Sequence, residues 1–261
     1  MRRPERQKKC KAPVKSLPPQ SANPRIEKRS TLLTLTFMTP FNPLAFIRDQ
    51  TRLMPPPLLP EVLLYLATEI TPLWQMTEDS LAQSNLPPPF WAVAWPGGQG
   101  MGRYVLDHPD LVRGKRVVDI ASGSGIVAIA AMKAGARQAL AIDIDPLALA
   151  AIKLNAEVNG VAVEACAGIP LDTAHRKADI ILAGDICYQQ AMSASLTRWL
   201  HLCVGADIPV LIADPGRAYV PENGLSALAQ YTVPTSLDIE DQESRLVTVW
   251  QLGLPAEEGD S

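Results

Sequence analysis

From about Arg103 onward, short apolar runs rich in β-branched residues alternate with longer stretches rich in Ala and Leu. This alternation is typical of a parallel α/β sheet, because a helix must carry the chain back before each new parallel strand. Five strands are predicted, over Lys115–Ile120, Gln138–Asp143, Val161–Ala165, Ala178–Ala183 and Pro209–Ala213. Helices are predicted over Gly125–Ala134, Pro146–Val158 and Gln190–Cys203.

Two more strands are predicted toward the C-terminal end, over Tyr231–Leu237 and Arg245–Leu252, after a helix near Leu225–Gln230. The two strands lie close together in the sequence. An antiparallel hairpin at one edge of the sheet is therefore expected.

Prolines and charges set the N-terminal third apart. Sixteen of the 24 prolines lie in residues 1–96, and residues 1–37 carry a charge of +8 before a body of −11. A leader of this composition buries too little apolar surface to offset its chain entropy. We therefore divide the chain into a disordered basic leader (1–37), a Pro-rich helical N-terminal lid (38–102), an α/β domain (103–252) and a tail (253–261). Within the lid, a helix is predicted over Glu61–Ile70.

Three interpretations of the leader compete: a nucleic-acid or membrane tail, a transit peptide, or sequence upstream of a start at Met38. We favour a leader that is dispensable for activity. The location expected from reduced thiols is cytoplasmic, or the mitochondrial matrix if the leader is a transit peptide. Because the body is acidic, nucleic acid is not an expected partner.

Composition narrows the class further. Apolar residues make up 47% of the 261 residues and charged residues 20%, which is typical of a globular protein. No apolar run approaches 18 residues, so no membrane span is expected. The four cysteines and three histidines show no ligand spacing, so no metal site is predicted.

The most informative local motif joins the first predicted strand to the first helix, in the segment Asp119–Gly125. Its glycines permit a tight turn, and the free N–H groups of the following helix can receive an anion. Asp143 ends the next strand, 20 residues beyond Gly123, where a carboxylate can bind both ribose hydroxyls. The spacing Gly123-x-Gly125-x-x-Ala128 also fits a dinucleotide site, so this pattern alone leaves both cofactors open.

Asp119–Gly125 resembles the first motif of the class I (seven-stranded) S-adenosylmethionine-dependent methyltransferases, and Ile142–Pro146 resembles their acidic loop after the second strand. One position departs from the pattern, because Ala121 stands where the first glycine is usual. Asp185-x-x-Tyr188 resembles the signature of a protein-lysine methyltransferase subgroup. The resemblance implies a Rossmann-like seven-stranded sheet, mostly parallel with an antiparallel C-terminal hairpin.

Three further segments resemble the electron transfer flavoprotein β-subunit lysine methyltransferase family: Pro89–Gln99, Asp214–Arg217 and Val247–Trp250. The resemblance covers roughly residues 60–252. It implies S-adenosyl-L-methionine as the cofactor and a lysine of the flavoprotein β subunit as the acceptor. Two alternatives stay open: a methyltransferase acting on a ribosomal protein or a small amine, and a nucleotide-binding module without turnover.

The resemblance also implies a site. Asp185 would orient the acceptor amine, and Tyr188 would supply an aromatic wall or a hydroxyl beside it. Arg217 and Trp91 would contact the substrate. The expected cofactor-binding residues are Trp95, Asp119, Ala121, Gly123, Gly125, Asp143, Ile144 and Asp185.

Overall fold

The computed structural model describes residues 41–68, 88–168, 171, 177–235, 240 and 242–254, and every structural statement below concerns these residues. The leader expected over residues 1–37 and most of the expected tail lie outside them.

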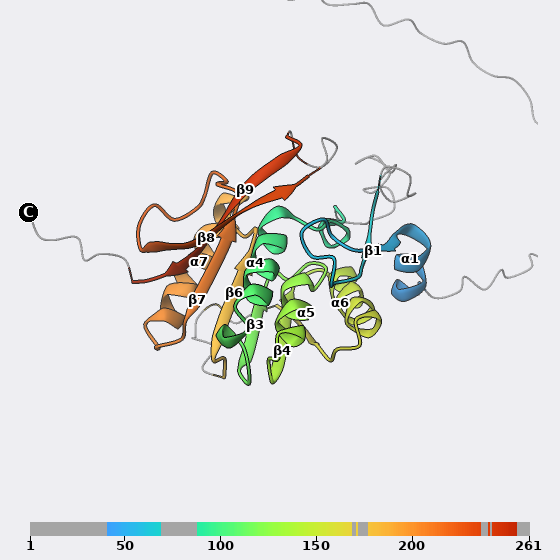
Figure 1. Ribbon diagram of the computed structural model, residues 1–261, viewed down its shortest axis with the longest axis horizontal. Coiled ribbons are helices and arrows are strands. Elements are labelled where there is room, and N and C mark those ends of the chain that lie inside the picture. The colour runs from blue at the N-terminus through green and yellow to red at the C-terminus, as the bar shows by residue number, and fades with distance from the viewer. Residues whose placement is uncertain are drawn as a thin grey trace, which may run out of the picture. The chain divides into compact units, whose positions relative to one another are not determined.

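A single seven-stranded sheet organises the described fold, in the order β5-β4-β3-β6-β7-β9-β8 (Figure 1). The first five of these strands pair in parallel, whereas β9 pairs antiparallel with both β7 and β8. This arrangement confirms the expected fold class. The strands are β3 (Arg116–Ile120), β4 (Gln138–Asp143), β5 (Glu164–Ala167), β6 (Ile180–Gly184), β7 (Val210–Asp214), β8 (Leu225–Pro234) and β9 (Ser244–Leu252).

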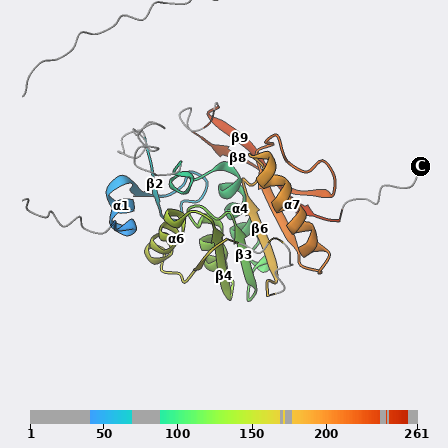
Figure 2. The same ribbon diagram turned by 180° about the vertical axis from the view of Figure 1, so that it is seen from behind.

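Helices cover both faces of the sheet. On one face α4, α5 and α6 pack over the strands, as Figure 1 shows, and α7 lies on the opposite face, which Figure 2 brings to the front. The helices are α1 (Pro43–Gln50), α4 (Pro96–Asp107), α5 (Ile126–Lys133), α6 (Pro146–Val158) and α7 (Gln190–Val204), with short 3-10 turns η1 (Phe90–Ala92) and η2 (Pro109–Leu111).

The core explains why the central strands are apolar throughout. Successive side chains of a strand point to opposite faces. In β6, Ile180 and Leu182 therefore join the cluster beneath α4 and α5, and Ile181 and Ala183 join the cluster beneath α7. Both faces are covered, so neither set of positions tolerates polar side chains.

The helix predicted near Leu225–Gln230 is wrong. These residues begin β8, which runs from Leu225 to Pro234 and pairs with β9 along its whole length, with an irregularity between Ala227 and Ala229. Ala, Leu and Gln favour a helix in isolation. Here the hydrogen bonds and side-chain contacts offered by β9 outweigh that propensity.

The helix predicted over Glu61–Ile70 is wrong over its described part. Leu64–Leu66 forms β2, which pairs antiparallel with β1 (Arg52–Met54). Leu64 and Leu66 are buried, whereas the intervening Tyr65 is only half-buried, which is the period of a strand. A short, uniformly apolar stretch does not by itself distinguish the two structures.

Helix α4 crosses the boundary expected between residues 102 and 103, and it packs against α5, β6, β7 and β9 as part of the helix layer. Small residues make this contact close. A Cβ on Gly97 would lie 2.5 Å from the Ala213 carbonyl oxygen, and a Cβ on Gly184 would lie 2.9 Å from the Gly98 Cα. The first turn of α4 therefore sits directly on the carboxyl ends of β6 and β7.

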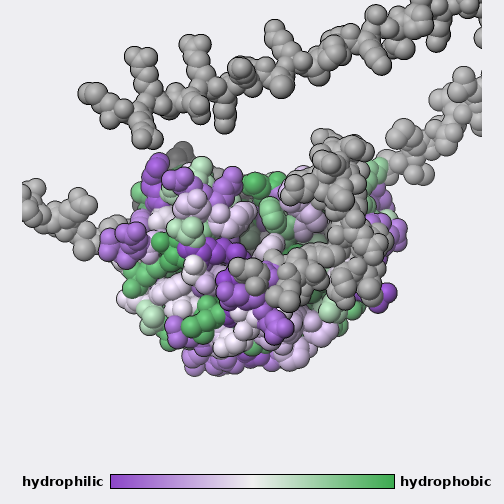
Figure 3. Space-filling model, turned by 90° about the horizontal axis from the view of Figure 1, so that it is seen from above, coloured by the Kyte–Doolittle hydropathy of each residue, from purple (hydrophilic) through white to green (hydrophobic). Residues whose placement is uncertain are grey.

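None of the described helices is long and apolar enough to cross a bilayer. On the face seen in Figure 3, hydrophilic and hydrophobic residues of the described part are mixed.

Candidate active site

The loops that follow β3, β4, β6 and β7 meet at one edge of the sheet, because the carboxyl ends of parallel strands lie together. The order of the sheet reverses between β3 and β6, since β3 leads outward to β4 and β6 leads outward to β7. Open α/β sheets bind their ligands in the crevice at such a reversal. The predicted site residues lie on both sides of it.

Asp119 is the last but one residue of β3 and is 1% exposed. Its Oδ2 accepts hydrogen bonds from the Ser122 hydroxyl and, at 3.1 Å, from the Ala128 N–H in the first turn of α5. Burial raises the pKa of this carboxyl to about 7. The described contacts of Asp119 therefore hold the glycine turn to the helix, and direct contact with the cofactor stays a prediction.

The turn after β3 uses backbone conformations that favour glycine. Gly123 and Gly125 have φ of 54° and 83°, and Ala121 has φ of 52°. An alanine in this left-handed region is strained by roughly 1–2 kcal/mol relative to glycine. The turn thus keeps the shape that a glycine at position 121 would give, at a local energetic cost.

Asp143 ends β4 and faces the same turn. Its Oδ2 accepts from the Gly123 N–H at 2.8 Å, and its Oδ1 accepts from the Asp145 N–H at 3.0 Å. The next residue, Ile144, is 82% exposed. The carboxylate and the exposed apolar side chain therefore lie side by side at the edge where a nucleoside is expected.

Asp185 follows β6 directly and is 9% exposed, with φ of 54°. Its Oδ2 accepts from the Gly98 N–H at 2.8 Å, and its Oδ1 accepts from Arg217 Nη2 at 3.3 Å. Burial raises the pKa of Asp185 to about 7, because the Arg217 charge offsets only part of the desolvation. Asp185 does not cap α7, whose N-cap is Gln189. Its carboxylate lies between the first turn of α4 and Arg217 instead.

Arg217 reaches Asp185 from the loop after β7. Asp214 shapes that loop, since its Oδ1 accepts from the Arg217 N–H at 2.6 Å and from the Gly216 N–H at 2.8 Å. The Arg217 guanidinium lies 5.7 Å from the centre of the Trp95 ring and donates from Nη2 to Glu240 Oε1 at 2.6 Å. Arg217, predicted to contact the substrate, thus pairs with Asp185 and with Glu240.

Three aromatic rings form a cluster that reaches Arg217, the partner of Asp185. Phe90 lies 6.0 Å from Trp95 and 5.7 Å from Tyr188, measured between ring centres, and the Trp95 Nε1–H donates to the Phe90 carbonyl oxygen. Tyr188 is 45% exposed, and burial of its hydroxyl raises its pKa. An incoming amine would thus meet a partly open aromatic wall beside a buried carboxylate.

Trp91 does not join this group. The structure places it in the core at 1% exposure, in a cluster with Leu147, Ala148 and Ala151 of α6, rather than on a surface that a protein substrate would touch. Among the described residues its Nε1–H has no hydrogen-bond partner. Because α6 follows Asp143 and Ile144, this donor lies on the side of the crevice that holds the glycine turn, Asp143 and Ile144, called the cofactor side below.

Two buried side chains in the site were not predicted in these roles. Asn155 lies fully buried inside α6, donates to the Ser124 carbonyl oxygen at 2.7 Å and accepts from the Tyr65 N–H at 2.8 Å. It therefore ties the glycine turn to β2. Glu240 is the second, and it joins Arg217 to Arg245. The sequence does give a signal for Asn155, because it is a polar residue within an otherwise apolar helix face. It gives no such signal for Glu240.

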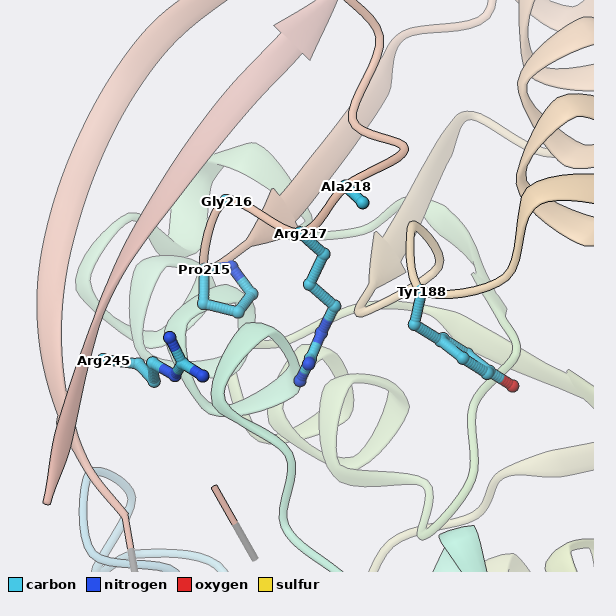
Figure 4. A pocket seen from close by; sticks show the side chains of 6 residues that line it. All are labelled: Tyr188, Pro215, Gly216, Arg217, Ala218 and Arg245. Atoms are coloured by element: carbon cyan, nitrogen blue, oxygen red, sulfur yellow. The ribbon is translucent and has the colours of Figure 1, made fainter. Parts of the chain in front are cut away.

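A cavity of about 320 Å³ is lined by Tyr188, Pro215, Gly216, Arg217, Ala218 and Arg245. Of these residues, Arg217 contacts Asp185. In Figure 4 the Arg217 side chain lies between Tyr188 on one side and Pro215 and Arg245 on the other.

Cys187, which precedes Tyr188 in the sequence, is fully buried, and burial raises the pKa of its thiol to about 12, so it is no nucleophile. Within the described part of the chain, no cluster of His, Cys, Asp and Glu could hold a metal ion.

A doubly wound sheet with a glycine turn after β3, an acid after β4 and Asp-x-x-Tyr after β6 defines a class I methyltransferase. Residues 104–188 match the family model described as ribosomal protein L11 methyltransferase (PrmA). An RNA methyltransferase from Salinibacter ruber, solved with S-adenosyl-L-homocysteine, has a TM-score of 0.43 at 19% identity, covering 65% of this chain and 100% of that one.

More extensive similarity is found to two curated proteins, both named electron transfer flavoprotein beta subunit lysine methyltransferase. The protein from Rattus norvegicus is 40% identical over 199 residues, which cover 74% of this chain and 77% of the relative. That from Homo sapiens is 36% identical over 217 residues, covering 79% and 80%. The chain belongs to the electron transfer flavoprotein β-subunit lysine methyltransferase family. It is a protein-lysine N-methyltransferase whose cofactor is S-adenosylmethionine.

Proposed function

We propose that this enzyme methylates a lysine of the β subunit of electron transfer flavoprotein, with Asp185 and Tyr188 at the acceptor nitrogen. The observation that carries the assignment of residues is the position of Asp185. It is a buried carboxylate at the reversal of the sheet, flanked by the partly exposed Tyr188. The relatives' names supply the proposed substrate.

The cofactor side of the crevice fits S-adenosylmethionine in its chemistry. The Asp143 carboxylate suits two ribose hydroxyls, and the exposed Ile144 offers an apolar surface for a base. The glycine turn and the first N–H groups of α5 suit the carboxylate of the methionine moiety. Trp91 Nε1, buried and without a partner among the described residues, is a further donor on this side.

When bound, the cofactor supplies a sulfonium methyl group: a bond forms between the lysine nitrogen and the methyl carbon while the carbon–sulfur bond breaks, and its electron pair goes to sulfur. The protein must hold the acceptor nitrogen in line with that bond and exclude water. Trp95 and Tyr188 present ring faces that suit a cation, each such contact contributing about 0.5–2 kcal/mol.

The first role of Asp185 is to orient the acceptor amine. Once ionised, it can accept an N–H of the acceptor amine and fix the direction of the nitrogen lone pair. A free lysine has a pKa of about 10.4, and a neighbouring carboxylate favours its ammonium form. Burial of the acceptor lysine beside the aromatic rings favours the neutral amine instead, because desolvation disfavours the charged form. The proton that the nitrogen must lose therefore goes to solvent, and Asp185 is proposed as an orienting group rather than the general base.

The charge of the body supports a basic target. Residues 38–261 carry a charge of −11, which attracts a Lys- and Arg-rich loop during encounter. Such steering weakens as salt is added, so the KM for the protein substrate should rise with ionic strength.

A ribosomal protein is the second candidate acceptor, because residues 104–188 match the ribosomal protein L11 methyltransferase model. That match covers the glycine turn, Asp143 and the Asp185–Tyr188 loop, and it ends before Arg217. It therefore supports the cofactor and the reaction type more than the acceptor. The loops after residue 188 distinguish the two candidates.

The test is incubation of the enzyme with isotopically labelled S-adenosylmethionine and either the flavoprotein or ribosomal protein L11. Mass spectrometry should find labelled methyl groups on a lysine of the flavoprotein β subunit and none on L11. Omission of enzyme is the first control, and Asp185→Asn is the second. Methylation of L11 with an unmodified β subunit would refute the substrate assignment.

We also propose that the enzyme works in the cytoplasm, or in the mitochondrial matrix if residues 1–37 act as a transit peptide. The full chain and a form beginning at Met38 should have equal activity on the purified substrate. Fractionation of cells that express each form then decides the location, because only a transit peptide makes the matrix location depend on residues 1–37.

A further inference from the structure

A buried carboxylate reaches the acceptor side of the site from the segment between β8 and β9. The Glu240 side chain is 4% exposed and lies between two guanidinium groups. Its Oε1 accepts from Arg217 Nη2 at 2.6 Å, and its Oε2 accepts from Arg245 Nη2 at 2.9 Å and from Arg245 Nε at 3.1 Å. Charge-assisted hydrogen bonds of this kind are about twice as strong as neutral ones.

Arg217 divides one donor between two carboxylates. The same Nη2 atom lies 2.6 Å from Glu240 Oε1 and 3.3 Å from Asp185 Oδ1. The shorter bond is with Glu240, so Glu240 holds the guanidinium partly away from Asp185. The Arg217 guanidinium lies over one face of the Trp95 ring, which limits its movement in that direction.

Among the described residues, the Asp185 carboxylate therefore has one positively charged partner, Arg217, and that contact is the longer of the two that Arg217 Nη2 makes. From α4 it meets only the backbone N–H of Gly98, from the loop after β7 it meets Asp214 and Arg217, and its own loop contributes Cys187 and Tyr188. Two buried carboxylates, Asp185 and Glu240, thus share the Arg217 guanidinium, and Glu240 also pairs with Arg245.

We infer that Glu240 is a positioning residue for methyl transfer: by binding Arg217 it limits the contact of Arg217 with Asp185 and leaves the Asp185 carboxylate available to the acceptor nitrogen. The inference rests on the proposed role of Asp185. Without Glu240, Arg217 moves onto Asp185, and the two groups neutralise each other where the amine should bind.

A direct test needs no substrate. Protein labelled with ¹³C-aspartate is titrated by NMR, and the Asp185 signal is assigned by its absence from Asp185→Asn. In Glu240→Gln, which keeps the size and one acceptor oxygen, the pKa of Asp185 should fall by about one pH unit, because Arg217 approaches it. In Arg245→Gln the pKa should rise, because Glu240 then acts on Arg217 alone and draws it further from Asp185. Arg113→Gln, whose partner Asp110 lies on the surface, is the control for loss of a charge elsewhere and should leave it unchanged.

Kinetics of methyl transfer to the flavoprotein β subunit give the second readout. In the wild type, kcat/KM should decrease as the pH falls below about 7, since protonated Asp185 cannot accept the N–H. Glu240→Gln should move this decrease to lower pH and reduce kcat at pH 8 on the order of tenfold, with the affinity for S-adenosylmethionine unchanged.

A role in folding alone would lower the melting temperature and leave the pKa of Asp185 and the pH profile where they are, and that result overturns the inference. Equal pKa values of Asp185 in Glu240→Gln and wild type overturn it as well. If the wild type does not methylate the β subunit, the proposed substrate fails, and the NMR titration still decides the role of Glu240.

Discussion

Each side of the crevice holds a buried aspartate, Asp119 on the cofactor side and Asp185 on the acceptor side. The two sides differ in how far apart in the sequence the hydrogen-bonded residues lie. On the cofactor side, the hydrogen bonds join residues that are near in the sequence: Asp119 to Ser122 and Ala128, and Asp143 to Gly123 and Asp145, at separations of 2 to 20 residues. On the acceptor side, Asp185 bonds to Gly98 across 87 residues and to Arg217 across 32.

This difference separates what a motif can encode from what only the assembled fold provides. A turn between a strand and a helix can specify its own polar contacts, because all partners arrive together as the turn forms. The acceptor side instead requires α4, β6 and the loop after β7 to be packed before the Asp185 carboxylate has its two partners, Gly98 and Arg217. Substitutions on the cofactor side should therefore act on binding, and those on the acceptor side on turnover.

The largest effect is expected on the acceptor side, from Asp185→Asn. The variant keeps the shape and loses the charge that would orient the amine. We expect kcat to fall by at least about a hundredfold, as is usual when a group that aligns reactants is lost. The affinity for S-adenosylmethionine, measured by calorimetry, should change by less than about threefold, because a neutral amide does not disrupt the fold around it. A comparable loss of affinity would place Asp185 on the cofactor side and break the comparison.

Asn155→Ala is expected to have the next largest effect, and it tests two contacts of the cofactor side that, unlike those of Asp119 and Asp143, join distant residues: Asn155 to Ser124 across 31 residues and to Tyr65 across 90. The change leaves the Ser124 carbonyl and the Tyr65 N–H without their partner in a buried site. Loss of a buried hydrogen-bonded group typically costs about 1–3 kcal/mol per group left unsatisfied, so the loss of two partners should lower the free energy of unfolding by at least about 2 kcal/mol. Urea denaturation measures it.

The matched control for Asn155 is Asn159→Ala at the end of the same helix. Asn159 bonds to both backbone groups of Leu63, but these contacts are exposed. Its loss should cost about 1 kcal/mol or less. If both variants were equally destabilised, burial of the Asn155 bridge would not explain its effect.

The same difference explains how far the sequence predicts this protein. Both Gln138–Asp143 and Pro146–Val158 have in the structure the bounds predicted for them, and β3, β6, β7 and α7 agree to within one or two residues at each end. These elements are periodic or continuously apolar, and their packing against neighbours agrees with their own propensities. β5 begins at Glu164 rather than Val161, since it lies at the edge of the sheet and pairs only with β4.

What the sequence does not predict depends on distant partners. The strand character of Leu225–Gln230 comes from β9, and that of Leu64–Leu66 comes from β1. Within the site, Asp119, Asp143 and Asp185 follow from spacing and resemblance, whereas the role of Glu240 does not. Nothing within 20 residues of Glu240 in the sequence indicates that its carboxylate meets Arg217, because only the pairing of β8 and β9 brings it there.

Asp143→Ala should show the binding effect of the cofactor side. The variant removes the carboxylate proposed for the ribose hydroxyls and the acceptor of the Gly123 N–H. The Kd for S-adenosylmethionine should rise about tenfold, equivalent to about 1.4 kcal/mol, while kcat at saturating cofactor stays within about threefold. The control is Asp145→Ala, which removes the cap of α6 at Leu147 without touching the turn. It should lower stability by about 1 kcal/mol and leave the Kd nearly unchanged.

The smallest effect is expected from Ala121→Gly. Ala121 has φ of 52°, and glycine relieves the left-handed strain of roughly 1–2 kcal/mol while adding about 0.5–1 kcal/mol of backbone entropy to the unfolded chain. The free energy of unfolding should therefore rise by at most about 1.5 kcal/mol. Ala121→Val is the opposed variant and should be destabilised, since a β-branched residue tolerates this conformation worse than alanine. Because the turn already has the shape that glycine would give it, the Kd for S-adenosylmethionine should change by less than about threefold in Ala121→Gly. A gain in affinity of tenfold or more, with unchanged stability, would show that Ala121 distorts the turn itself, and the cofactor side would then not be fixed by its local contacts alone.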